Sequence, residues 1–261
     1  LIISCLLLAV NTKAIVKMPA VFSDNMVLQQ KSNVPFWGTA SPGKALKITT
    51  SWDGKVYETK VGTNGNWELK VPTPTYGGPF SIEINDGTSL VLHNVMIGEV
   101  WICSGQSNME MPLAGWGKVL NYEKEVATAN YPDIRLLQVN KNTSTKPLSE
   151  MSVAMGGWVS CSPQTVTEFS SVGYFFGKNL YDKLKIPIGL INTSWGGTIA
   201  EAWTSGSTLK MMPDFNTAVL KMEESNEKVV DSKLKFEQEL SEWRSQVDKA
   251  DRGYVNGKPA W

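Results

Sequence analysis

The first segment whose side chains could do chemistry is Ser104–Glu110, with the sequence SGQSNME. It follows a near-continuous apolar run, Val95–Cys103, which predicts a buried strand. A serine on a tight turn between a strand and a helix projects its hydroxyl from the edge of a sheet, and Gly105 permits such a turn. Ser107 could therefore act as the nucleophile of an acyl transfer. The position where the usual nucleophile elbow has its second glycine is Met109, so a simple polar turn is the alternative.

The second segment is Asn192–Trp203, with the sequence NTSWGGTIAEAW. Paired glycines directly after a buried strand let backbone amides approach a ligand closely, which suits an oxyanion hole. Gly196 and Gly197 are therefore candidate oxyanion donors. A strand-to-helix turn that needs glycine only for its conformation would look the same.

The elements between these segments determine whether they can meet. Hydrophobic periodicity predicts three strands that alternate with two helices: Val95–Cys103, a helix at Lys118–Ala129, Ile134–Val139, a helix at Val172–Leu184, and Ile188–Asn192. This alternation is typical of a parallel sheet covered by helices on both faces. Ligands bind beyond the carboxyl ends of such strands, where both segments begin.

Residues 17–94 have a different pattern. Short runs of alternating polar and apolar residues are separated by the turn sequences SPG, DG and NGN, which predicts a small antiparallel β-sandwich. Its aromatic side chains could bind sugars, although aromatic residues in strands more often belong to the core.

Both ends of the chain carry distinct signals. Residues 1–14 begin with the apolar run LIISCLLLAV, which is too short to cross a bilayer and predicts a partial signal peptide of a periplasmic or secreted protein. A first core strand is the alternative. In an oxidising compartment Cys103 and Cys161 could form a disulfide.

Residues 209–261 predict a charged helical insertion. Apolar residues recur in sevens on one stripe of a long helix, and mixed charges form its solvated face. The stripe consists of Met222, Val229, Phe236, Trp243 and Ala250. Because such a stripe needs a packing partner, we expect the chain to be truncated.

Composition excludes several classes of protein. The 261 residues carry 25 basic and 25 acidic side chains, which argues against nucleic-acid binding through bulk positive charge and against a polybasic membrane-surface protein. Three cysteines and one histidine are too few for a zinc site built from cysteine and histidine. The single histidine, His93, limits any mechanism that needs an imidazole.

Taken together, GEVWICSGQSNMEMP and GLINTSWGGTIAEAW resemble the sialate O-acetylesterase family of carbohydrate esterases, a branch of the SGNH hydrolase superfamily. MPAVFSDNMVLQQ near the start is similar to the same family, so the resemblance extends over residues 18–205. It implies an α/β fold with an SGNH-like (flavodoxin-like) parallel sheet in residues 95–208, incomplete here, preceded by the β-sandwich and followed by the helical arm.

The resemblance also implies roles for individual residues. Ser107 would be the nucleophile, Gln106 and Asn108 would shape the site, and Gly196 and Gly197 would provide oxyanion amides.

The remaining matched positions have less defined roles. Asn192 would provide a side-chain donor, and Gly173 is the candidate for a further superfamily glycine. Glu201 and Trp203 would support the site, or form a structural salt bridge and a core indole.

The largest departure from the family is the missing general base. An Asp and a His near the carboxyl end of the family's catalytic domain complete the site, but no histidine follows Ser107. His93 precedes the strand that carries Ser107, so we expect it on the surface or between domains. We therefore expect this fragment to be nearly inactive.

The function expected for the full-length protein is removal of acetyl groups from O-acetylated sialic acid through a serine acyl-enzyme, without a metal or other cofactor. The alternatives are deacetylation of a polysaccharide such as acetylxylan and a noncatalytic carbohydrate-binding role. We expect an O-acetylated sugar as substrate, no nucleic acid and, after signal removal, no membrane as partner; the oligomeric state stays open.

Overall fold

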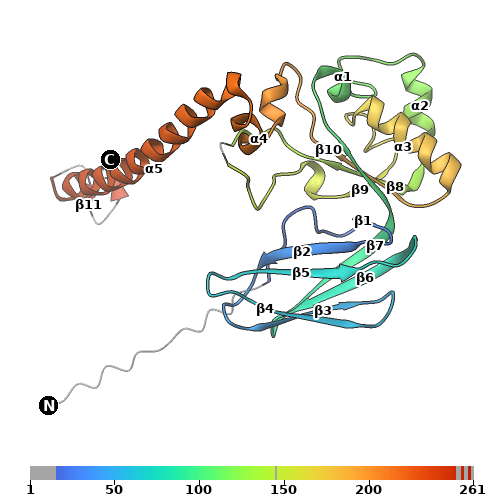
Figure 1. Cartoon of the computed structure of the whole chain (residues 1–261), viewed down its shortest axis with the longest axis horizontal. Coiled ribbons are helices and arrows are strands. Elements are labelled where there is room, and N and C mark those ends of the chain that lie inside the picture. The colour runs from blue at the N-terminus through green and yellow to red at the C-terminus, as the bar shows by residue number, and fades with distance from the viewer. Residues whose placement is uncertain (1–15, 145, 251–253, 256–257, 260–261) are drawn as a thin grey trace. The chain divides into compact units, whose positions relative to one another are not determined.

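The computed structural model describes residues 16–144, 146–250, 254–255 and 258–259 (Figure 1). The predicted signal peptide, residues 1–14, lies outside the described residues. The chain divides into two compact units, Leu1–Asn142 with Leu148–Thr198, and Thr143–Pro147 with Ile199–Trp261. The first unit holds the segment Ser104–Glu110 and residues 192–198 of the second predicted segment, whose residues 199–203 belong to the second unit.

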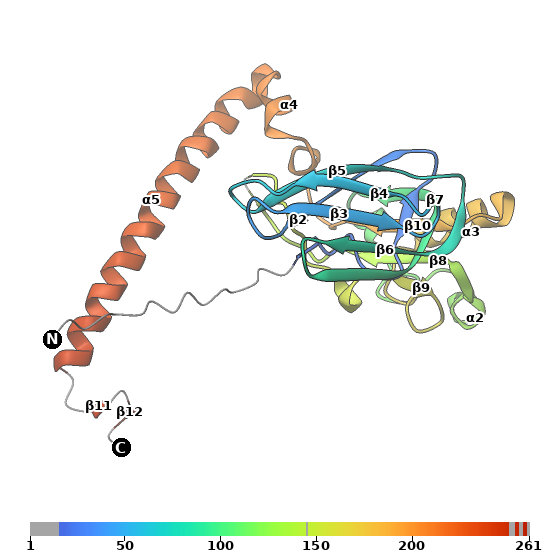
Figure 2. The same ribbon diagram turned by 90° about the horizontal axis from the view of Figure 1, so that it is seen from below.

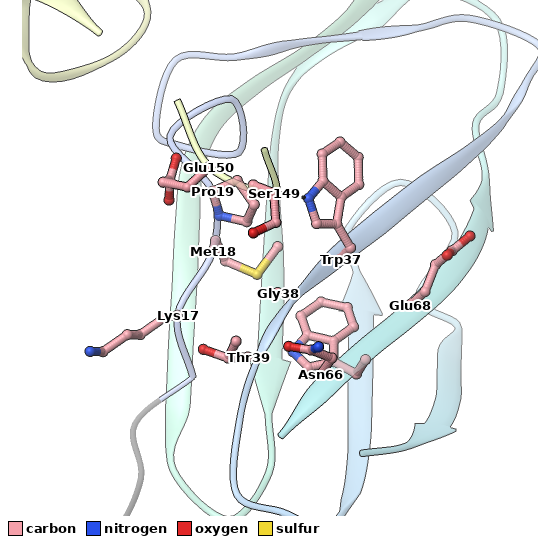
Figure 3. A pocket seen from close by; sticks show the side chains of 11 residues that line it. Lys17, Met18, Pro19, Trp37, Gly38, Thr39, Asn66, Glu68, Ser149 and Glu150 are labelled. Atoms are coloured by element: carbon pink, nitrogen blue, oxygen red, sulfur yellow. Dashed lines mark hydrogen bonds between the residues drawn. The ribbon is translucent and has the colours of Figure 1, made fainter. Parts of the chain in front are cut away.

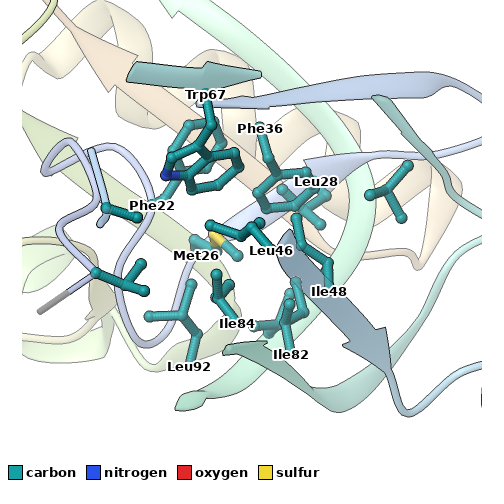
Figure 4. Packing of buried hydrophobic residues seen from close by; sticks show 14 of the residues in the cluster. Phe22, Met26, Leu28, Phe36, Leu46, Ile48, Trp67, Ile82, Ile84 and Leu92 are labelled. Carbon is teal, nitrogen blue, oxygen red and sulfur yellow. The ribbon is translucent and has the colours of Figure 1, made fainter. Parts of the chain in front are cut away.

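The first unit begins with two antiparallel sheets that pack face to face. One consists of β2 (Asn33–Thr39) and β5 (Asn66–Pro72), and the other includes β3 (Ala45–Thr50), β4 (Val56–Lys60) and β6 (Gly77–Asn85). Turns at Asp53-Gly54 and Asp86-Gly87 join neighbouring strands of the second sheet, as their sequences predict. Apolar residues on the inner faces form a closed core between the sheets (Figure 4), including Phe36, Leu46, Ile48, Val71, Ile82 and Ile84.

One long strand, β7 (Ser89–Cys103), connects this sandwich to the parallel part of the fold. It pairs antiparallel with β6, and then its last five residues pair parallel with β10 (Ile188–Asn192). The sequence predicts a separate strand from Val95, but β7 runs unbroken through Asn94. The sequence suggests a boundary there because alternating polar and apolar residues give way to a continuous apolar run, whereas in the structure the strand passes through Asn94 with a positive φ of 55°.

The parallel sheet continues from β10 to β8 (Tyr131–Gln138), and the full strand order is β4-β3-β6-β7-β10-β8-β9. The edge strand β9 (Val159–Cys161) runs antiparallel to β8, and the short β1 (Val27–Gln29) pairs parallel with β7. The α/β fold class predicted from the sequence is confirmed.

Helices cover one face of the parallel strands. The helix α3 (Ser171–Leu184) packs on β10, with a Cβ placed on Gly177 only 2.6 Å from Leu190 Cδ1. Shorter helices are α1 (Ser107–Glu110), α2 (Tyr122–Thr128) and the 3₁₀ turn Ala154–Gly156. On the opposite face a Cβ on Gly189 would meet Val27 and Trp158. That face is therefore packed by β1 and Trp158 where the sequence predicts helices.

The second unit contains the 3₁₀ turn η2 (Ala200–Trp203), α4 (Gly206–Lys210), α5 (Pro213–Ala250), and the strand pair β11 (Tyr254–Val255) and β12 (Lys258–Pro259). The predicted long helix is present as the 38-residue α5 (Figure 2). Of its predicted apolar stripe, Met222, Phe236 and Trp243 are exposed, whereas the side chains of Val229 and Ala250 lie outside the described residues. None of the described helices combines the length and hydropathy that crossing a bilayer requires.

Candidate active site

The carboxyl ends of β7 and β10 lie side by side, because Cys103 is the register partner of Asn192. Beyond the strands the pairing continues: the Thr193 amide donates to the Cys103 carbonyl at 3.0 Å, and the Trp195 amide donates to the Gly105 carbonyl at 2.8 Å. Gly105 has a φ of +145°, which L side chains rarely adopt. The two predicted segments therefore meet at one edge of the sheet.

Ser107 and Gly196 are neighbours within this edge. Ser107 is exposed and begins α1, and a Cβ built on Gly196 would lie 3.1 Å from Ser107 Oγ. The absence of a side chain at Gly196 thus leaves space beside the hydroxyl. Gln106 at the N-cap and Asn108 in the helix are also exposed.

Gly197 lies on the outer side of the same loop. It is exposed, has a φ of +79°, and no heavy atom lies within 4 Å of the position of an added Cβ. Its glycine character is explained by backbone conformation, whereas that of Gly196 is explained by close packing against Ser107 and Glu110.

A carboxylate that the sequence analysis did not single out joins the two loops. Glu110 Oε2 accepts a hydrogen bond from the Gly196 amide, and Glu110 Oε1 forms an ion pair with Lys141. The pairing with Lys141, reinforced by the Gly196 amide and opposed by burial, lowers the pKa of Glu110 from its ordinary value. The Gly196 amide is thus engaged by a protein carboxylate in this structure. In the sequence, the indication that Glu110 could belong to the site is that it follows Ser107 by three residues. This spacing places two side chains on the same face of a helix.

The Asn192 side chain holds the loop that carries Gly196 and Gly197. Its side chain is 2% exposed and donates to Gln138 Oε1 at 2.9 Å. Its Oδ1 accepts from the amide of Ser194 at 3.1 Å and from the hydroxyl of Ser194 at 2.7 Å. The Asn192 side chain therefore ties the loop that carries the glycines, through Ser194, to Gln138 at the end of β8.

The family described as "carbohydrate esterase, sialic acid-specific acetylesterase" matches residues 97–242, which include both loops. The chain belongs to this family. The murine sialate O-acetylesterase is 34% identical over 208 residues, and the human sialate O-acetylesterase is 31% identical over 210 residues. These alignments cover 73% and 74% of this chain, but 38% and 40% of the relatives, so the chain spans about two fifths of their length.

A solved structure supports the same assignment. The crystal structure of a carbohydrate acetylesterase from Xanthomonas citri aligns with a TM-score of 0.68 and 35% sequence identity. The alignment covers 75% of this chain and 44% of that protein. The fold is therefore that of a carbohydrate acetylesterase over most of the chain.

Gly173, the candidate for a further superfamily glycine, lies where α3 packs beneath the serine loop. A Cβ at Gly173 would lie 3.1 Å from Cys103 Sγ, so the glycine lets the start of α3 approach the end of β7.

Cys103 and Cys161 are buried free thiols, so the disulfide that the sequence leaves open is not formed. Burial raises the pKa of Cys103 to about 11 and that of Cys161 to about 12, which disfavours the reactive thiolates.

The single histidine does not lie beside Ser107. His93 is exposed and precedes Cys103 by ten residues along β7, about 33 Å of extended strand. Glu201 and Trp203 belong to η2 in the second unit. Within the described residues, no cluster of three or more His, Cys, Asp and Glu side chains could hold a metal ion.

Proposed function

We propose that the protein is a carbohydrate O-acetylesterase in which Ser107 attacks the acetyl carbonyl. The observation that carries this proposal is the position of the exposed Ser107 hydroxyl beside Gly196, at the joined carboxyl ends of two parallel strands. The names of the relatives, all acetylesterases, support the same reaction.

The reaction proceeds in two steps. The serine oxygen bonds to the acetyl carbon, the bond from that carbon to the sugar oxygen breaks, and the sugar oxygen takes up the proton that the serine hydroxyl gave to the general base. Water then hydrolyses the acetyl-serine and releases acetate. The first step needs a general base within hydrogen-bond reach of the serine hydroxyl. His93 does not fill this role because of its distance along β7.

The tetrahedral oxyanion is stabilised by backbone amides. The amides of Ser107 and Gly197 are the donors in this proposal, since the Gly196 amide already donates to Glu110. Gln106 and Asn108 are exposed next to Ser107 and contact the substrate. Glu110 acts as a positioning residue, because its carboxylate links the Gly196 loop to the turn of Ser107.

The substrate is an O-acetylated sugar, and we assign O-acetylated sialic acid on the basis of the family and the names of the mammalian relatives. The alternative is an acetylated polysaccharide such as acetylxylan. The name of the solved relative, a carbohydrate acetylesterase, supports ester cleavage without naming a sugar. The two loops select ester cleavage and do not distinguish these sugars.

Acetate release by the whole protein, expressed at its natural length, tests both assignments. The proposal expects release from O-acetylated sialic acid to exceed release from acetylxylan. The opposite order would replace the assigned sugar with the alternative, and no release from either substrate would overturn the esterase assignment. Subcellular fractionation tests the periplasmic or secreted location proposed from residues 1–14.

A further inference from the structure

The β-sandwich of the first unit carries a cavity of about 560 Å³, within the size range of small-molecule sites (Figure 3). None of the residues of the two active-site loops lines it. Its walls come from three parts of the first unit: the segment Lys17–Pro19, the paired strands β2 and β5, and the loop residues Ser149 and Glu150.

The pairing of β2 with β5 places two indoles and an amide at this cavity. Gly38 is the register partner of Trp67, and Thr39 is the partner of Asn66. A Cβ on Gly38 would clash with the carbonyl oxygen of Lys17 and lie 3.3 Å from the Trp67 ring. The glycine therefore permits Lys17 to bridge to Thr39, with bonds of 2.8 and 2.9 Å, beside the Trp67 ring.

Trp37 provides an aromatic surface in a fixed orientation. Its indole N–H donates to the Ser149 carbonyl at 3.4 Å, and its ring meets Phe22 edge to face at a centroid distance of 4.6 Å. Glu150 holds the neighbouring loop by accepting from the Ala20 amide at 3.0 Å. Figure 3 shows Trp37 beside Ser149. Because the half-buried ring is already held on two sides, binding a ligand to it orders little additional structure.

The cavity also has hydrogen-bonding groups for a polar ligand. Trp67 belongs to the buried core and forms the floor of the cavity with its ring. Asn66 and Glu68 are exposed at the same cavity. Asn66 can both donate and accept, whereas the Glu68 carboxylate accepts, and hydroxyl groups match both functions.

The charges of the lining residues select against an anion. Lys17 is the one basic residue among them, whereas Glu68 and Glu150 are acidic. Figure 3 shows Lys17 and Glu68 on opposite sides of the cavity. An acidic sugar would face more negative than positive charge, and a fully apolar ligand would desolvate both carboxylates. A neutral ligand with one apolar face and several hydroxyls fits these walls best.

We propose that this cavity binds an uncharged sugar ring of a glycan chain. The C–H face of the ring stacks on Trp37, and its hydroxyls bond to Asn66 and Glu68. The binding needs no ester and no nucleophile, so it stands independently of the chemistry proposed for Ser107.

Calorimetric titration of the 261-residue chain with xylohexaose, cellohexaose, mannohexaose and N-acetylneuraminic acid tests this proposal. We expect at least one neutral oligosaccharide to bind, and Trp37→Ala to leave any binding of N-acetylneuraminic acid, which belongs to the esterase site, unchanged. Trp37→Ala should weaken binding about tenfold. Trp243→Ala, a matched control at a 59% exposed site in α5, should bind like the unmodified chain.

A second variant tests the proposal in case Trp37→Ala does not fold. Asn66 is exposed in β5, so Asn66→Ala should keep the thermal unfolding transition and still weaken binding severalfold. The proposal is overturned when no neutral oligosaccharide binds at millimolar concentration, or when Asn66→Ala and Trp37→Ala bind as tightly as Trp243→Ala. Unchanged binding by Ser107→Ala separates this site from the esterase site, whose failure would appear only in acetate release.

Discussion

The two loops at the shared edge of the sheet differ in where their polar groups point. The loop after β7 exposes Gln106, Ser107 and Asn108 to solvent, whereas the loop after β10 buries Asn192 and Ser194 beneath its glycines. The side chains of the first loop are thus free to react and contribute little to stability. The buried hydrogen bonds of the second loop fix the backbone that carries its glycines. Chemistry and stability are therefore separable at this edge, although the loops are hydrogen-bonded to each other.

The sharpest test of this separation is Ser107→Ala. Loss of the nucleophile should lower acetate release by the whole protein about 10³-fold or more, while the exposed position leaves the free energy of unfolding unchanged. Kinetic assays and urea unfolding measure the two effects. Ser104→Ala, another exposed serine in the same turn, is the matched control and should retain activity. Comparable activity in both variants would remove Ser107 as the nucleophile.

Gly196→Ala should have the next largest effect. The added methyl group would lie 2.6 Å from Glu110 Oε2 and 3.1 Å from Ser107 Oγ, so both side chains must move. A displacement of this size lowers kcat about 100-fold. Steady-state kinetics on an O-acetylated sugar provides the measurement.

Gly197→Ala is the variant with which Gly196→Ala is compared. The site is open, but the φ of +79° makes alanine unfavourable by about 1 kcal/mol. Stability should therefore fall more than for Gly196→Ala, and kcat less. Equal kinetic effects of the two substitutions would contradict the packing role assigned to Gly196.

Asn192→Ala tests the buried side of the comparison. It leaves Gln138 Oε1 and the Ser194 hydroxyl without their partner, which should lower the free energy of unfolding by about 2 kcal/mol. Urea unfolding measures this loss. Asn108→Ala removes the same kind of side chain from an exposed position and should change stability little. If both variants unfold at the same urea concentration, the loop after β10 is not held as described.

The smallest effect concerns the carboxylate between the loops. The pKa of Glu110 is depressed below 4.5 in the folded protein, so its contribution to stability is fully present above pH 4.5 and is lost as pH falls through the depressed value. Glu110→Gln should therefore reduce stability by about 1 kcal/mol or less at pH 7, since Lys141 is partly exposed. Unfolding curves of both proteins should converge in acid, and a difference that grows as pH falls would contradict the ion pair.

Local sequence pattern predicted the elements that deliver the site. The strand Ile188–Asn192 and the helix ending at Leu184 follow from apolar periodicity, and the glycines after β10 follow from turn chemistry. The unbroken course of β7 through Asn94 did not, because the change from alternating to continuous apolar residues at Val95 looks like the boundary between two strands.

Such patterns do not predict contacts between residues that are far apart in the sequence. Glu110 lies 86 residues from Gly196, and nothing in either local sequence indicates their hydrogen bond. The burial of Asn192 depends on Gln138, 54 residues away on the neighbouring strand. Side-chain partners across a sheet edge arise from tertiary packing, which periodicity does not encode.

Covalent labelling shows directly whether Ser107 is the nucleophile. The whole protein is treated with a fluorophosphonate ester, which phosphonylates activated serines, and peptides are analysed by mass spectrometry. We expect one phosphonyl group on Ser107, with parallel loss of acetate release, and no labelling of Ser107→Ala. An active enzyme that is labelled at another serine, or inhibited without modification of Ser107, would contradict it.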